Sequence, residues 1–195
     1  MSRFVFTQAR ARPLAWVTAL DSGKPVPGWP YVVDTLTLPF ENPWRALFFS
    51  GGHDFFSNGD IAICTMTGDV WRVSGVDATL AKLRWKRTAT GLHQPLGLVV
   101  VEDKVCVLGR DQITRLHDLN GDGEADFYEC LSNDFTTPTG GHDFMCGLER
   151  DALGNFYTAS GKEGLLRILP GKKAEVMASG FRNPDGLGLA PDGTL

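Results

Sequence analysis

Twelve consecutive residues near the middle of the chain, residues 118–129, have the composition and spacing of a calcium-binding loop. Oxygen-bearing side chains stand at loop positions 1, 3, 5, 9 and 12, a backbone carbonyl is available at position 7, and Gly123 occupies position 6, where the chain must turn sharply. Calcium is a hard cation that takes six to eight oxygen ligands, so this spacing has a chemical reason. The predicted ligands are Asp118, Asn120, Asp122, Glu124, Asp126 and Glu129.

The sequence around this loop lacks the two helices that an EF-hand requires. Residues 105–108 are typical of a strand, and only Cys130 and Leu131 separate the loop from the polar residues 132–134. We therefore expect a calcium loop between two strands, with the structural role of stabilising the folded state. The alternative is an acidic, solvated turn without a metal, in which four carboxylates at ligand positions would repel one another.

A second group of candidate residues lies in three segments, 91–98, 140–148 and 180–189, that share Gly-Leu pairs. Each segment precedes an apolar run and a turn, and the intervals of roughly 40 to 50 residues are typical of propeller repeats. In a propeller, the segment that leads into each innermost strand lines the central channel. The segments would place His93, His142 and the pair Arg182-Asn183 at roughly equivalent points.

His142 has the chemistry of a general base, because an imidazole with a reference pKa of about 6.5 can accept a proton near neutral pH. Arg182 could hold an anionic or quinone oxygen with its fork of donors. The alternative for His142 is a structural residue whose ring nitrogens are satisfied by hydrogen bonds.

Short apolar runs bounded by Gly, Pro, Asp and Asn predict an all-β fold, with one short helix possible over residues 77–87. The repeat favours a partial β-propeller over a sandwich, with about three to four blades of a six-bladed propeller. Residues 46–195 are expected to form blades and to be truncated at the C-terminus, and residues 1–45 to be an N-terminal extension or an incomplete blade. The predicted strand runs are residues 31–38, 46–49, 60–64, 70–73, 98–101, 105–108, 155–159 and 165–169.

Composition excludes several classes of protein. The net charge of −4 gives no basic footprint for nucleic acid. The sequence contains no run of about 18 apolar residues, so no transmembrane helix is predicted, and the N-terminus lacks the apolar core of a signal peptide. The four cysteines form no C-x-x-C pair, which argues against a zinc ribbon and attached haem. We expect buried thiols in strands, with a disulfide as the alternative.

Residues 91–195 resemble the soluble glucose/sorbosone dehydrogenase superfamily, six-bladed propellers that use pyrroloquinoline quinone (PQQ). The sharpest match is residues 180–187, which are similar to the G-x-R-N-P-x-G-[LM] segment of that family. The resemblance implies that Arg182 and Asn183 contact the quinone and that His142 lies near the position of the catalytic base. Asp185 stands where the glucose enzyme has Gln.

A closer resemblance covers most of the chain, through residues 30–39, 51–56, 68–71 and 108–118. These segments are similar to large exported proteins of planctomycetes and verrucomicrobia that are called membrane-bound dehydrogenases or haem-binding proteins. The resemblance implies a periplasmic or exported protein that joins the propeller to a c-type cytochrome domain, with any haem outside this chain. The expected function is a quinoprotein-type sugar or alcohol dehydrogenase-like domain. The alternative is a non-catalytic propeller that binds carbohydrate or a protein partner.

Overall fold

The computed structural model describes residues 4–8, 32–77, 80, 82–136, 139 and 141–195, with side chains described from residue 35 onward. These residues form fourteen strands and no helix, which confirms the predicted all-β fold. No helix that could cross a membrane is found in this part of the chain.

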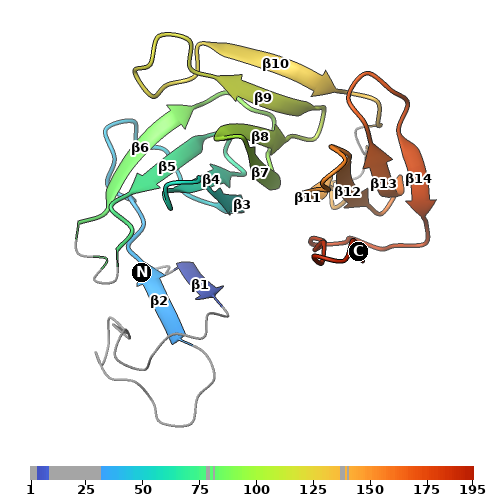
Figure 1. The fold of residues 1–195 in the computed structure, drawn as a ribbon, viewed down its shortest axis with the longest axis horizontal. Coiled ribbons are helices and arrows are strands. Elements are labelled where there is room, and N and C mark those ends of the chain that lie inside the picture. The colour runs from blue at the N-terminus through green and yellow to red at the C-terminus, as the bar shows by residue number, and fades with distance from the viewer. Residues whose placement is uncertain (1–3, 9–31, 78–79, 81, 137–138, 140) are drawn as a thin grey trace.

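Three sheets of four antiparallel strands follow one another along the chain and lie around an arc, with β3, β7 and β11 towards its inner side (Figure 1). Within each sheet, every strand pairs with its neighbour in sequence, so each sheet is a simple meander. The first sheet contains β3 (Ser50–Phe55), β4 (Ile61–Thr65), β5 (Val70–Ser74) and β6 (Arg84–Ala89). The second contains β7 (Gly97–Val101), β8 (Lys104–Leu108), β9 (Ile113–His117) and β10 (Phe127–Ser132). The third contains β11 (Cys146–Arg150), β12 (Phe156–Ser160), β13 (Gly164–Ile168) and β14 (Glu175–Ala178).

Burial along the strands follows their place in the sheets. β4 and β12 are buried at every residue, because each lies inside its sheet and is covered on both faces. β13 alternates between buried and half-buried residues, as a strand with one better-covered face does. β14 is the outer edge of the third sheet and is exposed throughout. Continuous apolar runs in the sequence therefore mark inner positions of the sheets, and the outer strands give weaker signals.

Two hydrophobic cores fill the spaces between successive sheets. Between the first and second sheets, Cys64 and Val70 share a buried cluster with Val107. Between the second and third sheets, Ile113 shares another cluster with Phe156. Full burial of an aliphatic or aromatic side chain contributes roughly 1.5–3 kcal/mol, so face-to-face packing of the sheets is the main source of their association. A third cluster covers the other face of the first sheet with side chains from the segment that precedes it.

The inner strands approach one another through glycines. A Cβ atom on Gly52 would lie 3.0 Å from the Gly97 Cα, and one on Gly97 would lie 2.8 Å from the Gly147 carbonyl carbon. A Cβ atom on Gly147 would lie 3.1 Å from the Gly186 Cα. Any larger residue would push the neighbouring backbone away, since ordinary contact begins near 3.4 Å. The repeated Gly-Leu pairs in the sequence therefore have a packing reason, and we call these four residues the inner-strand glycines.

An antiparallel pair of strands precedes the three sheets. β1 (Phe4–Gln8) pairs with β2 (Val32–Leu36), with Phe4 opposite Leu36. β2 falls within the predicted strand at residues 31–38. The assignment of residues 1–45 as an extension or an incomplete blade stays a prediction, and so does the boundary at residue 46.

Three details of the predicted elements are wrong. Residues 46–49 are an irregular lead into β3, because Phe48 packs against the outer face of the first sheet and does not join it. The possible helix over residues 77–87 is not formed by the described part of this segment, where β6 begins at Arg84 and pairs with β5. β14 was not predicted, since its apolar run of residues 176–178 is short and lies on an exposed edge strand.

Candidate functional site

The segments that lead into the inner strands repeat one backbone geometry. Gly91 and Gly180 both have positive φ, 81° and 92°, and Gln94 and Asn183, three residues further on, have φ values of 45° and 48°. A proline follows in each case. Positive φ is uncommon outside glycine, so its recurrence at the same two steps shows that segments 91–98 and 180–187 are equivalent parts of one repeat.

The predicted site residues lie on these segments, but they are not all equivalent. His93 and Arg182 each stand four residues before the inner-strand glycine of their repeat, whereas His142 stands five residues before its own. Asp143 is therefore the residue that corresponds to His93 and Arg182. His142, Arg182 and Asn183 are all exposed, so their side chains are accessible from solvent.

Asp143, in segment 140–148, is bound to the turn between β12 and β13. Its Oδ1 accepts a hydrogen bond from the Gly161 nitrogen at 2.8 Å, and its Oδ2 accepts one from the Lys162 nitrogen at 2.9 Å. A Cβ atom on Gly161 would lie 3.3 Å from Asp143 Oδ1 and 3.4 Å from the Asn183 nitrogen. The structure thus brings the backbone of Asn183 close to the carboxylate that follows His142 in sequence.

Arg110 connects segment 91–98 to segment 140–148 and was not predicted as a site residue. Its Nη1 donates to Gln94 Oε1 at 3.0 Å, and its Nη2 donates to the Asp143 carbonyl at 3.3 Å. The guanidinium lies 4.8 Å from the centre of the Phe144 ring. These contacts fix a cation between two of the segments. Arg110 lies in the turn after β8, at the same end of the sheet as the segments. This position could have identified Arg110 from the sequence.

A cavity of about 250 Å³ runs along the inner strands, lined by glycine backbone and by the ionisable side chains of His53, Asp54, Glu149 and Asp185. Asp54 is held in place, since its Oδ2 accepts a hydrogen bond from the Val100 nitrogen at 2.7 Å. Burial raises the pKa of Glu149, and the Asp54 charge raises it further. Burial lowers the pKa of His53, against the opposing effect of Asp54. The cavity therefore holds a carboxyl and an imidazole that both favour their neutral forms, a property common at functional sites.

The sequence prediction did not include the cavity residues Asp54 and Glu149, although the repeat contained a signal for them. Each stands two residues after an inner-strand glycine, so both occupy the same position of equivalent strands. Side chains at one strand position recur on one face of the sheet. Alignment of the repeats on their glycines would have grouped the two carboxyl groups.

The predicted calcium loop joins β9 to β10, the two outer strands of the second sheet, as the strand–loop–strand interpretation requires. Asp118 Oδ1 and Oδ2 accept hydrogen bonds from the nitrogens of Gly121 at 2.7 Å and Gly123 at 2.8 Å. Asn120 Oδ1 accepts one from the Asp122 nitrogen at 2.8 Å. Gly121 and Gly123 have φ values of 80° and 82°, which the tight turn needs. The loop is therefore closed by its own side-chain oxygens.

The ligand at loop position 12 is engaged elsewhere. Glu129 lies on β10, and its Oε2 is 2.7 Å from His117 Nε2 and 3.8 Å from Arg115 Nη1. Across the described residues, no three His, Cys, Asp or Glu side chains are gathered as a metal-binding group. The all-oxygen donor set suits calcium, and binding by Glu129 would require its carboxylate to leave His117.

Comparison with solved structures identifies the architecture. A Thermus thermophilus protein named as an oxidoreductase (glucose dehydrogenase) is similar with a TM-score of 0.54 and 18% identity, over 75% of this chain and 55% of that chain. This chain folds as three blades of a β-propeller. Its innermost strands are β3, β7 and β11, and these strands begin side by side, since Gly52 lies against Gly97 and Gly97 against Gly147.

Two further solved structures match less closely. A protein of unknown function from Bacteroides caccae has a TM-score of 0.48 and 12% identity, over 74% of this chain and 50% of that one. A catalytically inactive virginiamycin B lyase from Staphylococcus aureus, with quinupristin, has a TM-score of 0.49 and 15% identity, over 80% and 49%. The chain spans about half the length of these structures. No protein-family model and no curated protein matches its sequence.

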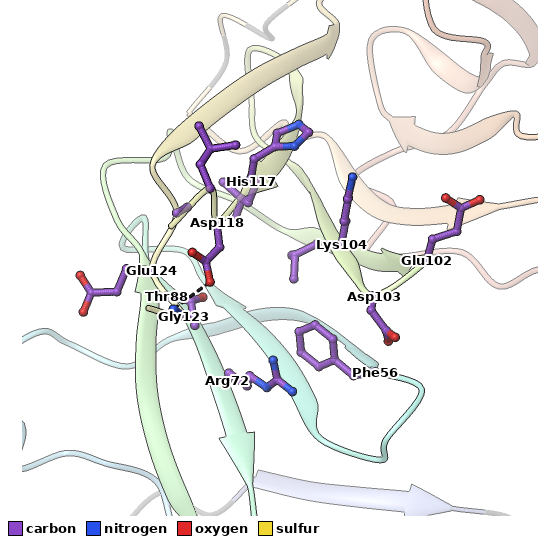
Figure 2. A pocket seen from close by; sticks show the side chains of 14 residues that line it. Phe56, Arg72, Thr88, Glu102, Asp103, Lys104, His117, Asp118, Gly123 and Glu124 are labelled. Atoms are coloured by element: carbon purple, nitrogen blue, oxygen red, sulfur yellow. Dashed lines mark hydrogen bonds between the residues drawn. The ribbon is translucent and has the colours of Figure 1, made fainter. Parts of the chain in front are cut away.

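A groove of about 400 Å³ lies between the first and second blades, at the other end of the inner strands from the segments described above (Figure 2). Phe56 lies in it, with the Arg72 guanidinium 4.3 Å above its ring. Asp103 crosses the blade boundary and accepts a hydrogen bond from the Ser57 nitrogen at 2.7 Å. Figure 2 shows Asp118 directed towards Gly123 at the edge of this groove. The loop therefore borders the boundary between two blades.

The cysteines have a packing role in the propeller. All four are free, and Cys64, Cys106 and Cys146 are buried, as predicted for small apolar residues in strands. Burial raises the pKa of Cys64 to about 12 and that of Cys146 to about 11. These thiols stay protonated at neutral pH, which removes them as nucleophiles.

Proposed function

We propose that this chain supplies three blades of a quinoprotein-type dehydrogenase propeller that oxidises a sugar or an alcohol. The observation that carries the proposal is the repeated geometry of the segments before the inner strands. Arg182, which is exposed, stands at the same point of this repeat as Asp143, which His142 precedes, and the exposed Asn183 follows Arg182. The similarity to the Thermus thermophilus structure supports the fold of such a propeller.

Arg182 and Asn183 are the residues of this chain that would hold PQQ. Arg182 has the planar fork of donors that matches carboxylate and quinone oxygens, and Asn183 can both donate and accept. Asn183 has a positive φ of 48°, so its backbone adopts a conformation similar to that of Gln94 in the equivalent segment. PQQ, when bound, supplies the acceptor for the hydride of the substrate.

His142 would take the proton from the substrate hydroxyl. Its exposure leaves the ring accessible, and it stands next to Asp143, which is held by the turn between β12 and β13. Positive charge on Arg182 would stabilise negative charge that develops on the reacting oxygen. Glu149 and His53 lie in the channel cavity. The neutral imidazole of His53 could receive a proton, whereas Glu149, whose raised pKa favours the protonated carboxyl, could donate one.

Calcium is the second part of the proposal. The loop at residues 118–129 would bind calcium with oxygens of Asp118, Asn120, Asp122, Glu124 and Asp126, with Glu129 joining after it leaves His117. The role would be structural, because the loop borders the boundary between two blades and lies at the far end from Arg182. By the resemblance, a c-type cytochrome domain of a larger exported protein would accept the electrons.

Reconstitution with PQQ and calcium, followed by dye-linked oxidation of sugars and alcohols, tests the catalytic proposal. His142→Ala should abolish turnover and leave PQQ binding unchanged. His93→Ala is the matched control, because it removes the same ring from another segment. Unchanged turnover in His142→Ala would remove this residue from the base role. PQQ uptake without oxidation of any substrate would favour the propeller that only binds carbohydrate or protein.

Thermal unfolding tests the calcium proposal. A ligand that binds only the folded state raises the melting temperature, and a concentration of about 100 times Kd adds roughly 2.7 kcal/mol of stability. We expect unfolding at a higher temperature with calcium than with a chelator. Asp118→Ala should remove the difference, and equal melting temperatures for the unsubstituted protein would contradict a calcium site.

A further inference from the structure

The outermost strand of the first blade lies against the loop of the second blade. Lys86, on β6, donates a hydrogen bond from Nζ to the Asp122 carbonyl. Two residues further on, the Thr88 carbonyl accepts a hydrogen bond from the Ala125 nitrogen at 2.7 Å. A third contact joins the Tyr128 hydroxyl to the nitrogen and the carbonyl of Thr90, both at 3.1 Å. The loop is thus attached to the first blade along the length of β6.

The ammonium group of Lys86 lies directly over the turn of the loop. A Cβ atom on Gly123, at loop position 6, would lie 2.9 Å from Lys86 Nζ and 3.5 Å from its Cδ and Cε. Within the described part of the chain, this ammonium forms no ion pair with a single carboxylate, and its contact is with a backbone carbonyl. Its charge therefore acts on the loop as a whole.

The charge of the loop explains why a cation is held there. Five acidic residues occur between positions 118 and 129 with no Lys or Arg among them. Like charges at such spacing repel, and a nearby cation reduces that repulsion. The Asp118 and Asp122 side chains accept hydrogen bonds from loop nitrogens, and no group of metal ligands is gathered in the described residues. Lys86 supplies positive charge to the loop in this arrangement.

We propose that Lys86 is a tethered cation that sets the calcium affinity of the loop and couples calcium binding to the contact between the first and second blades. The inference rests on the calcium site proposed above. An ammonium and a divalent cation in one loop repel each other, so calcium binding must either displace Lys86 or act against its charge. Calcium would then bind more weakly than the oxygen set alone allows, and the bond from β6 to Asp122 would weaken as calcium binds.

Isothermal titration of calcium into Lys86 variants tests this inference. Lys86→Gln and Lys86→Met should each bind calcium roughly three- to tenfold more tightly than the unsubstituted protein, because the repelling charge is gone. Lys86→Arg keeps the charge and should stay within about twofold. Lys172→Gln is the matched control, since it removes one positive charge from an exposed site in the third blade. The gain should shrink at high salt, where exposed charges are screened.

The outcomes separate the two proposals. If the unsubstituted protein binds calcium and both uncharged Lys86 variants bind it no more tightly than Lys172→Gln, the role of Lys86 is wrong and the calcium site stands. If neither the unsubstituted protein nor the Lys86 variants bind calcium, both are wrong. Binding by Lys86→Gln alone would support the lysine as a block on the site. In a chelator, Lys86→Gln should also melt at a lower temperature than Lys172→Gln, because the contact from β6 is lost.

Discussion

Substitution of Gly97 by Ala places a methyl group directly between the second and third blades. The new Cβ would lie 2.7 Å from the Leu148 nitrogen and 2.8 Å from both the Gly147 carbonyl carbon and the Leu148 Cβ. Two of these three atoms are backbone, so no rotation of a side chain can relieve the contact. β11 must move by more than half an ångström to restore ordinary separation, which begins near 3.4 Å.

Overpacking of this kind costs about 2–3 kcal/mol in the free energy of unfolding. For a chain of this size, each kcal/mol lowers the melting temperature by about 2–4 °C, so Gly97→Ala should melt about 4–12 °C lower. Urea unfolding followed by circular dichroism measures the free energy directly. The midpoint should fall while the slope with urea stays unchanged, since the surface exposed on unfolding is the same.

Gly188→Ala is the control for this experiment. No atom lies within 4 Å of a Cβ at Gly188, and its φ is not positive, so alanine meets neither a contact nor backbone strain. Loss of freedom in the unfolded chain should make this variant neutral or more stable by about 0.4–1 kcal/mol. If Gly97→Ala is as stable as Gly188→Ala, the blades are not held together by close contact of their inner strands.

Substitutions at three residues test the channel cavity. The folded pKa of Glu149 is raised, so its contribution to stability is full below its unfolded pKa near 4.5 and is lost as pH rises through the folded value. Glu149→Gln should therefore be more stable than the unsubstituted protein in urea unfolding at pH 7 and not at pH 4. An equal gain in stability at both pH values would contradict the raised pKa. The folded pKa of His53 is lowered from 6.5, so its contribution to stability is present above pH 6.5 and is lost as pH falls through the folded pKa. Between pH 7 and pH 5, His53→Asn should therefore lose less stability than the unsubstituted protein. Equal losses of stability would contradict the lowered pKa. Asp54→Ala leaves the Val100 nitrogen without its acceptor and should lower the free energy of unfolding by about 1–3 kcal/mol. Asp54→Asn keeps an acceptor oxygen and should lower it less. Equal losses in the two variants would show that the hydrogen bond contributes nothing.

The fold could be predicted from the sequence wherever burial is complete. Central strands such as β4 and β12 are buried on both faces, so they appear as apolar runs, and the inner-strand glycines appear as Gly-Leu pairs. β14 was not predicted, because its apolar run, residues 176–178, is only three residues long. The sequence Arg84–Ala89 contains three cations and no apolar run, and its pairing with β5 is a tertiary effect that overrides local preference.

The candidate site was predictable only in part. The motif around Arg182 and the loop at residues 118–129 depend on local spacing, which the sequence contains. The pairing of Glu129 with His117 depends on the register between β9 and β10, which the loop pattern does not specify. The cavity residue Glu149 and the bridging Arg110 depend on which strands and turns share one end of the channel.

A dehydrogenase propeller of the proposed kind must bind PQQ, and a non-catalytic propeller need not, so PQQ binding distinguishes the two. Titration of PQQ into the protein in the presence of calcium, followed by tryptophan fluorescence, measures it directly. We predict saturable binding that Arg182→Gln weakens by about tenfold or more, because a charge-assisted pair of hydrogen bonds is lost. Lys172→Gln, which removes the same charge at a distant site, should leave the affinity unchanged. Absence of saturable binding, or equal affinity in Arg182→Gln, would contradict the proposed function.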